Sequence, residues 1–116
     1  MGTSDFASLQ RLATTVELNR GWSEDSLASK CMLLGEEVGE LFQAVRALGY
    51  GAVHDGSRTR SAVEDELADV TFVLLTIANR LDVDLGHAIG TKLEKDDHRS
   101  WSAASSSLCL WPRESA

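Results

Sequence analysis

Proline, aromatic side chains and cysteine are all scarce in this chain of 116 residues. Pro112 is its single proline, and Phe, Trp and Tyr together make up 6% of the residues. Proline breaks helix interiors, whereas sheets favour aromatic and β-branched residues. The composition therefore predicts an all-α protein, and its apolar content of 43% is enough to build a core.

The chain has neither cysteines spaced for a disulfide framework nor a long apolar run. Cys31 and Cys109 are too few and too far apart for a disulfide framework or a CxxC metal motif. The longest apolar run lies near 70–75, far short of the ~20 residues that cross a membrane. The N-terminus lacks the basic-then-apolar pattern of a leader segment. We therefore expect a cytoplasmic protein without membrane association.

Positive charge is also in short supply. The chain has 11 Lys and Arg residues against 18 Asp and Glu, a formal net charge of −7. Proteins that bind a nucleic-acid polymer need a basic patch that releases counterions, so this function is not expected. A small phosphorylated ligand stays compatible with the charge, because a bound metal ion reverses the local sign.

Apolar residues recur at helical spacing in four segments. They predict helices over 5–20, about 24–48, 61–81 and about 84–99, with Ser23 capping the second helix and Gly49 ending it. Such helices predict a four-helix bundle in residues 1–99, followed by a serine-rich tail over 100–116. The segment 67–78 is apolar nearly all round and needs more cover than one small bundle supplies. We expect self-association through the apolar helices into a homodimer or homotetramer.

Two acidic clusters interrupt these apolar segments. On a helix, side chains three or four residues apart share one side. Glu37 is therefore a neighbour of Glu40, and Glu66 of Asp69, which is expected to point toward apolar surroundings; Glu36 lies further toward the polar side. Like charges at this spacing repel each other, more strongly when they are desolvated. A divalent cation is the simplest way to offset that repulsion.

Three interpretations of the acidic clusters compete. A solvated acidic ridge would need basic partners, but these two helices contain only Lys30, Arg46 and Arg80. A ferritin-like di-iron centre would need Glu-x-x-His motifs, and no histidine follows Glu37 or Glu66 at that spacing. An all-oxygen ligand set instead suits Mg²⁺, with Mn²⁺ as a possible substitute.

The ordered motifs resemble those of the MazG-type all-α nucleoside triphosphate pyrophosphohydrolases over roughly residues 5–99. The matching segments are Lys30-x-x-x-Leu34-x-Glu36-Glu37-Val38-Gly39-Glu40-Leu41, Glu66-Leu67-Ala68-Asp69-Val70, Asp84-Leu85 and Lys92-Leu93-Glu94-Lys95. The resemblance implies hydrolysis of a (deoxy)nucleoside triphosphate to monophosphate and pyrophosphate. A house-cleaning role against non-standard or surplus nucleotides follows from it.

The resemblance also implies roles for individual residues. Glu37, Glu40, Glu66 and Asp69 would be magnesium ligands, and Glu36 would either support these ligands from behind or position and deprotonate the attacking water. Lys92 and Arg99 would contact phosphates, although cations near a helix C-terminus also favour the helix dipole. Asp96 stands where the family has an asparagine that meets the nucleotide.

Substrate choice is where the chain differs most from this pattern. Trp22 would stack on the base, or else cap the end of the bundle. Val73 stands where several pyrimidine-specific relatives have a tyrosine, so pyrimidine specificity does not follow. The glycine-rich connection 49–59, with Arg58 and nearby Arg60, would either close over phosphates or serve as a linker. A catalytically silent nucleotide-binding module and a structural helical-bundle interaction protein are the alternative functions.

Overall fold

The computed structural model describes residues 5–49 and 60–98, which form four α-helices and no strand. The helices are α1 (Phe6–Arg20), α2 (Leu27–Ala47), α3 (Arg60–Arg80) and α4 (Leu85–Asp97). The prediction of an all-α protein is therefore confirmed. The chain divides into two compact units, Met1–Gly86 and His87–Ala116, and the first of them contains the acidic clusters.

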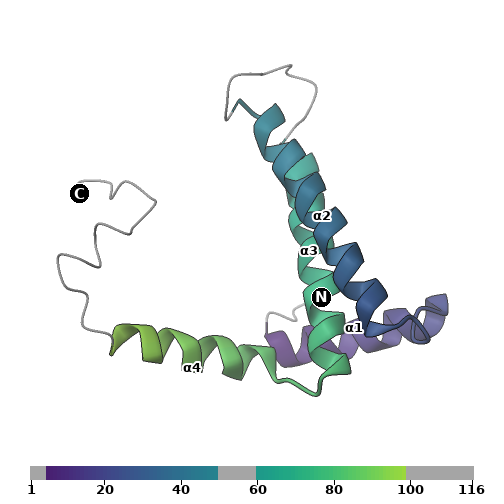
Figure 1. Ribbon diagram of the computed structural model, residues 1–116, viewed down its shortest axis with the longest axis vertical. Helices are drawn as coiled ribbons and strands as arrows, with labels where there is room; N and C mark the ends of the chain where they lie inside the picture. Colours follow the sequence, from purple (N-terminus) through teal and green to yellow (C-terminus); the bar gives the residue numbers. More distant parts are fainter. Residues whose placement is uncertain (1–4, 50–59, 99–116) are drawn as a thin grey trace. The chain divides into compact units, whose positions relative to one another are not determined.

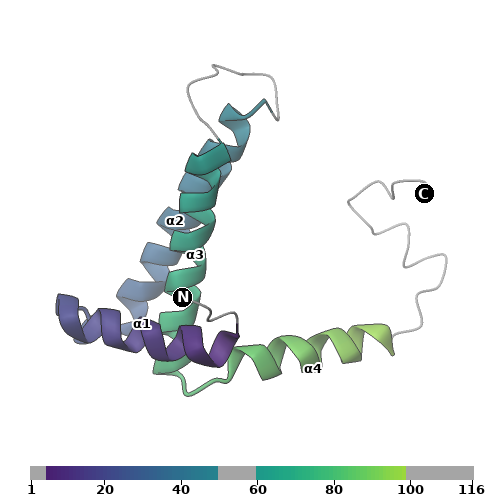
Figure 2. The same ribbon diagram turned by 180° about the vertical axis from the view of Figure 1, so that it is seen from behind.

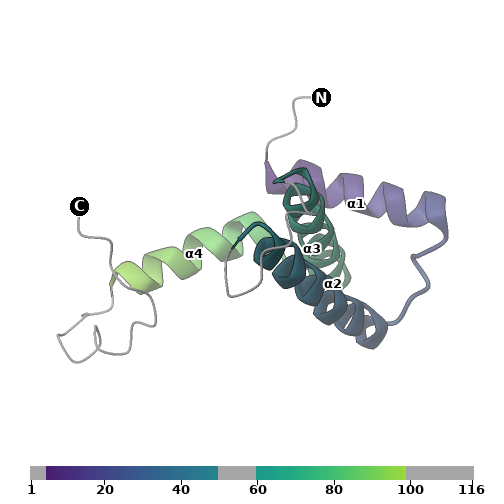
Figure 3. The same ribbon diagram turned by 90° about the horizontal axis from the view of Figure 1, so that it is seen from above.

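In the first unit, α2 and α3 run antiparallel side by side, and α1 crosses α3 (Figure 1, Figure 2). Seen along the helix pair, α3 lies between α1 and α2 (Figure 3). Small and branched side chains fill the core between these helices: Ala13, Ala44, Val73, Leu75 and Ala78 are buried. A core of small residues lets the helices approach closely, so polar side chains along the α2–α3 contact meet one another directly.

A polar network ties α1 to the end of α3. The Gln10 side chain donates to Asn79 Oδ1 at 2.9 Å and to the Val83 carbonyl at 2.8 Å. Asn79 Nδ2 donates back to the Gln10 carbonyl at 2.8 Å. Gln10 Oε1 also accepts from Leu85 N, the first residue of α4, at 3.0 Å. Gln10 thus satisfies a backbone donor that has no partner inside its own helix.

The predicted start of the second helix is wrong by one turn. Ser26, not Ser23, is the N-cap of α2, and its hydroxyl accepts from Ser29 N at 3.1 Å. Ser23 lies in a turn that Asp25 N closes by donating to the Trp22 carbonyl at 3.2 Å. The predicted end agrees well, since α2 ends at Ala47 and Gly49 has a positive φ of 112°.

The apolar segment 67–78 is covered on only part of its circumference within one chain. Val73, Leu75 and Ala78 are buried, but Leu67 is 48% exposed and Leu74 is 41% exposed. The self-association that would cover these leucines stays a prediction. The division into a domain over 1–99 and a tail over 100–116 is also untested, because residues 99–116 lie outside the described part of the chain.

None of the described helices combines the length and the apolar character that a membrane-spanning helix requires.

Candidate functional site

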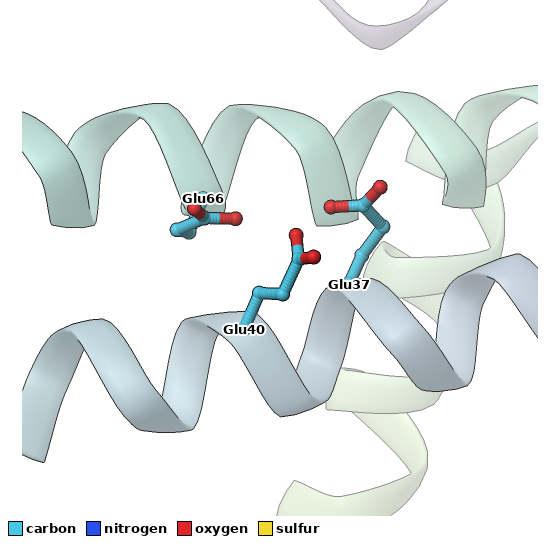
Figure 4. Close-up of side chains that lie close together, drawn as sticks. All are labelled: Glu37, Glu40 and Glu66. Carbon is cyan, nitrogen blue, oxygen red and sulfur yellow. The ribbon is translucent and has the colours of Figure 1, made fainter.

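Three carboxylates converge between α2 and α3. Glu37 and Glu40 extend from α2 and Glu66 from α3, so that the three side chains enter the space between the two helices (Figure 4). One carboxylate oxygen of each lies within 4.8 Å of those of the other two. The spacing predicted from helical periodicity therefore produces a real cluster, because the antiparallel packing places Glu66 opposite the last two turns of α2.

Glu37 contributes a partly buried carboxylate to this cluster. Its Oε2 is buried and has no hydrogen-bond partner among the described residues. Burial raises the pKa of Glu37 above its ordinary value, and the charges of Glu40, Asp69 and Glu66 raise that pKa further. A buried carboxylate oxygen without a hydrogen bond is costly, and protonation of Glu37 or a bound cation would reduce that cost.

Repulsion in the cluster is large enough to matter for the fold. Two unit charges about 4–5 Å apart interact by roughly 1 kcal/mol in water and roughly 4 kcal/mol at an effective dielectric of about 20. A domain of this size has a net stability of about 5–15 kcal/mol. Two or three such pairs would consume a substantial part of that stability without a neutralising partner.

Lys30 and Arg80, two of the basic side chains of α2 and α3, are engaged elsewhere. Lys30 is buried and forms an ion pair with buried Glu17 of α1. Arg80 donates to the carbonyls of Ser23 and Asp25 at 3.1 and 2.5 Å. The solvated ridge with basic partners, considered from the sequence, is therefore not what surrounds this cluster in the described chain.

The three carboxylates fit a hard divalent cation. They offer oxygen ligands only, come from two helices that hold their spacing, and include the buried Oε2 of Glu37, which has no hydrogen bond among the described residues. Magnesium takes one or two carboxylates and completes its coordination with water and substrate phosphates. No histidine joins the cluster, so the donor set is unsuited to the di-iron arrangement.

Glu36 and Asp69 stand beside the cluster rather than in it. Both side chains are exposed, and neither belongs to the group of three. Glu36 precedes Glu40 by one turn on α2. Its exposure agrees with the predicted position toward the polar side of the helix. The expectation that Asp69 points into apolar surroundings is wrong, although its charge still acts on the pKa of Glu37. Asp69 lies at the edge of the α2–α3 contact, where water reaches it.

Trp22 lies between α1 and α2 and contacts Phe72, which stands one helical turn along α3 from Asp69. Its ring meets Phe72 edge-on, with centroids 6.3 Å apart and an interplanar angle of 70°. Phe72 follows Asp69 by three residues, so the two share one side of α3. The Arg20 guanidinium stands 5.0 Å from the Trp22 ring centroid, and the tryptophan stays 40% exposed. The aromatic pair thus lies where the segment between α1 and α2 meets α3, and its tryptophan is open to water.

The predicted substrate contacts near the C-terminus belong to the second unit. Lys92 and Asp96 form an ion pair with each other across one turn of α4. Lys92 remains exposed, and Asp96 is half-buried. Arg99, Arg58 and most of the 49–59 connection lie outside the described residues, whereas Arg60 begins α3 and pairs with Glu64 at 3.7 Å.

Sequence reasoning missed the polar contacts that hold α1 and the segment before α2 in place. Glu17 and Lys30 were not predicted to pair, and Arg80 was considered only as a possible partner of the carboxylates. One signal was available for Lys30, since it precedes Glu37 by seven residues and so lies on the same side of α2. Its partner on α1 depends on helix packing, which local spacing does not encode.

Comparison with known proteins identifies the family. The profile of the MazG nucleotide pyrophosphohydrolase domain matches residues 26–102, which include all the acidic motifs. The chain belongs to the MazG family. A crystal structure of YPJD from Bacillus subtilis, to which pyrophosphatase activity is attributed, is similar with a TM-score of 0.72 and 27% identity. The match covers 86% of this chain and 100% of that one. No curated protein matches the chain at a comparable level.

Membership of the MazG family confirms the predicted resemblance and the all-α fold. It also supports nucleotide pyrophosphohydrolase activity as the general reaction class. The individual roles of the acidic residues, Trp22, Lys92, Asp96 and Arg99 are not decided by family membership and stay predictions.

Proposed function

We propose that this MazG-family protein is a magnesium-dependent pyrophosphohydrolase that converts a (deoxy)nucleoside triphosphate to its monophosphate and pyrophosphate. The observation that carries the proposal is the convergence of Glu37, Glu40 and Glu66 between two helices, where the buried Oε2 of Glu37 lacks a hydrogen bond among the described residues. Lys30 and Arg80, two basic side chains of the same helices, are engaged elsewhere. A nucleotide that brings its own metal ion supplies the missing positive charge.

Glu37, Glu40 and Glu66 would hold the ion, and Asp69 would complete the ligand set from the edge of the cluster. Bound there, magnesium would neutralise the phosphate charge and activate a water molecule for attack. Glu36 is exposed one turn before Glu40, and we assign it the role of holding and deprotonating that water. Most of the rate enhancement would then come from positioning and charge neutralisation.

Trp22 and Phe72 offer a platform for the base of the nucleotide. Phe72 follows Asp69 by one turn of α3, and we place the phosphates of the substrate at the carboxylates and its base at the aromatic pair. A half-exposed tryptophan stacks on any base, because every base has a π-face. Platforms of this kind suit a house-cleaning enzyme that accepts several modified or surplus nucleotides, which is the role we propose.

One observation favours the alternative of a catalytically silent nucleotide-binding module. Lys92, predicted to contact phosphates, is paired with Asp96 within the same helix. A lysine already neutralised by a carboxylate attracts phosphate less strongly, so binding or turnover would be weaker than in relatives with asparagine there. Asp96→Asn should therefore raise kcat/KM of an active enzyme.

Two further proposals concern the setting of the enzyme. Exposed leucines on α3, at positions 67 and 74, favour self-association into a homodimer or homotetramer. The acidic composition and the scarcity of cysteine suit a cytoplasmic protein that acts on nucleotides rather than on nucleic-acid polymers.

Pyrophosphate release tests the proposal directly. The protein is incubated with standard and modified nucleoside triphosphates in the presence of Mg²⁺, Mn²⁺ or EDTA. Pyrophosphate and monophosphate should appear together with either metal and not with EDTA. Release of inorganic phosphate instead, or no product from any nucleotide, would contradict the proposal, and binding without turnover would favour the silent module.

A further inference from the structure

The segment 21–26, which joins α1 to α2, is held by a side chain of α3. Arg80 stands in the last turn of α3, and its two terminal nitrogens donate to the carbonyls of Asp25 at 2.5 Å and Ser23 at 3.1 Å. A guanidinium presents several donors in a planar fork, so it can hold two carbonyls at once. Hydrogen bonds from a charged donor are roughly twice as strong as neutral ones.

Trp22 lies within the segment that Arg80 holds. The Trp22 amide donates to the Glu17 carbonyl at 2.9 Å, and its carbonyl accepts from Asp25 N at 3.2 Å. Its backbone is therefore fixed on one side by the end of α1 and on the other by the turn that Arg80 grips. The ring has two neighbours, the edge of Phe72 and the guanidinium of Arg20. The tryptophan stays 40% exposed, so the position of its backbone contributes to where the ring stands.

Arg80 shares a face of α3 with the acidic cluster. Residues 66, 69, 73, 76 and 80 follow one another at intervals of three and four, which places them along one side of the helix. Val73 and Thr76 between the carboxylates and Arg80 are buried, so this stretch of helix is well fixed. The helix α3 thus positions Glu66 near one end and, through the hydrogen bonds of Arg80, binds the segment that contains Trp22 at the other.

Arg80 has no carboxylate partner among the described residues, although the protein is acidic. The segment that it grips carries Glu24 and Asp25, yet the guanidinium bonds to backbone oxygens instead. Side-chain ion pairs would leave the path of the backbone free. Bonds to carbonyls fix that path.

We propose that Arg80 is a positioning residue of the substrate site, which sets the distance between the Trp22 ring and the carboxylates by gripping the carbonyls of Ser23 and Asp25. This inference rests on the proposed function, since it takes Trp22 as the platform for the base. A nucleotide must reach from the acidic cluster to the ring, so a fixed distance lowers the entropy lost on binding. Arg80 therefore acts on substrate affinity and leaves the chemical step unchanged.

Steady-state kinetics of Arg80→Met and Arg80→Lys test the inference. Methionine keeps the stem and removes every donor, whereas lysine keeps the charge but is a single point donor. KM for the best nucleotide should rise about tenfold in Arg80→Met, with kcat within about twofold of the unchanged protein. Arg80→Lys should give an intermediate KM. Arg46→Met, which removes an exposed arginine from the last turn of α2, is the matched control and should change neither constant.

Tryptophan emission provides a readout in the free protein. Trp101→Phe and Trp111→Phe leave Trp22 as the one tryptophan of the chain. In that background, acrylamide should quench Trp22 more strongly in Arg80→Met than in Arg46→Met. Unchanged quenching together with an unchanged KM would overturn the inference, as would a fall in kcat at constant KM. Should Arg80→Met fail to fold, a folded Arg80→Lys with the KM of the unchanged protein overturns it equally.

Failure of the proposed function gives a different pattern. An unchanged protein that releases no pyrophosphate from any nucleotide contradicts the proposed function and removes the link to substrate, whatever Arg80 does. A protein that turns over normally while Arg80→Met keeps its KM contradicts only the role of Arg80.

Discussion

The two halves of the α2–α3 pair differ in how their charged side chains are paired. Where α2 begins and α3 ends, charges are matched: Lys30 pairs with Glu17, and Arg80 is satisfied by two carbonyls. Two turns along α2 from Lys30, three carboxylates converge without a described cation beside them. The same two helices therefore contain a region of paired polar groups and a region where three carboxylates lie close together.

We attribute the paired charges to the stability of the fold and the clustered carboxylates to its function. A buried ion pair roughly balances its own desolvation cost, so it is compatible with a stable fold even where it adds little. An unmatched cluster lowers stability in the free protein and persists only if a ligand completes it. Substitutions in the region of Lys30 and Arg80 should have large effects on folding. Substitutions in the acidic cluster should have large effects on activity.

The largest effect is expected from breaking the buried pair on one side only. Lys30→Met leaves the carboxylate of Glu17 buried without a partner, which should cost about 3–5 kcal/mol of unfolding free energy. The double variant Lys30→Met with Glu17→Leu should recover most of that loss, because both charges are then removed. Urea unfolding measures each difference. A single variant as stable as the unchanged protein would show that the matched half is dispensable.

A substitution in the acidic cluster should lower activity strongly without lowering stability. Glu37→Gln removes a predicted ligand and should lower kcat/KM about a hundredfold or more, equivalent to about 2.7 kcal/mol. In EDTA the variant should unfold at the same temperature or a higher one, because repulsion among the carboxylates is relieved. Asp65→Asn, an exposed position next to Glu66, is the matched control and should change neither property. Comparable losses in both variants would point to general acidity rather than a defined site.

The smallest effect concerns pH. Burial and the neighbouring carboxylates raise the pKa of Glu37 in the folded protein above its ordinary value of 4.5. The folded state therefore binds this proton more tightly than the unfolded state does. Its contribution to stability is fully present below about pH 4.5 and is lost as the pH rises through the raised pKa.

Thermal unfolding in EDTA measures this contribution by difference. Glu37→Gln cannot lose the proton, so its advantage in melting temperature over the unchanged protein should grow as the pH rises from about 4.5. An advantage that is constant with pH, or that shrinks as the pH rises, would contradict the raised pKa.

The sequence predicted the helices and the acidic cluster for the same reason, since both follow from spacing along one helix. Apolar periodicity placed α1 and α3 within one residue of their observed ends, and the intervals of three in Glu37–Glu40 and Glu66–Asp69 indicated shared sides. Antiparallel packing of neighbouring helices then made the meeting of the two clusters a reasonable expectation.

The failures all depend on contacts between distant segments. Ser23 and Ser26 are equally good caps by local rules, and Arg80 of α3 bonds to the backbone around Ser23. The partner of Lys30 comes from the register of α1 against α2, which the apolar pattern leaves open. The exposure of Asp69 likewise depends on how α2 and α3 are rotated, a quantity that no local motif specifies.

The central claim is that the unmatched carboxylates form a cation site. Thermal unfolding of the free protein with and without Mg²⁺, compared between the unchanged chain and Glu37→Gln, tests it most directly. A ligand at 100 times its dissociation constant stabilises the folded state by about 2.7 kcal/mol. Magnesium should therefore raise the melting temperature of the unchanged protein by several degrees and leave that of Glu37→Gln nearly unchanged. An equal response of both proteins, or no response of either to Mg²⁺ or Mn²⁺, would contradict the claim.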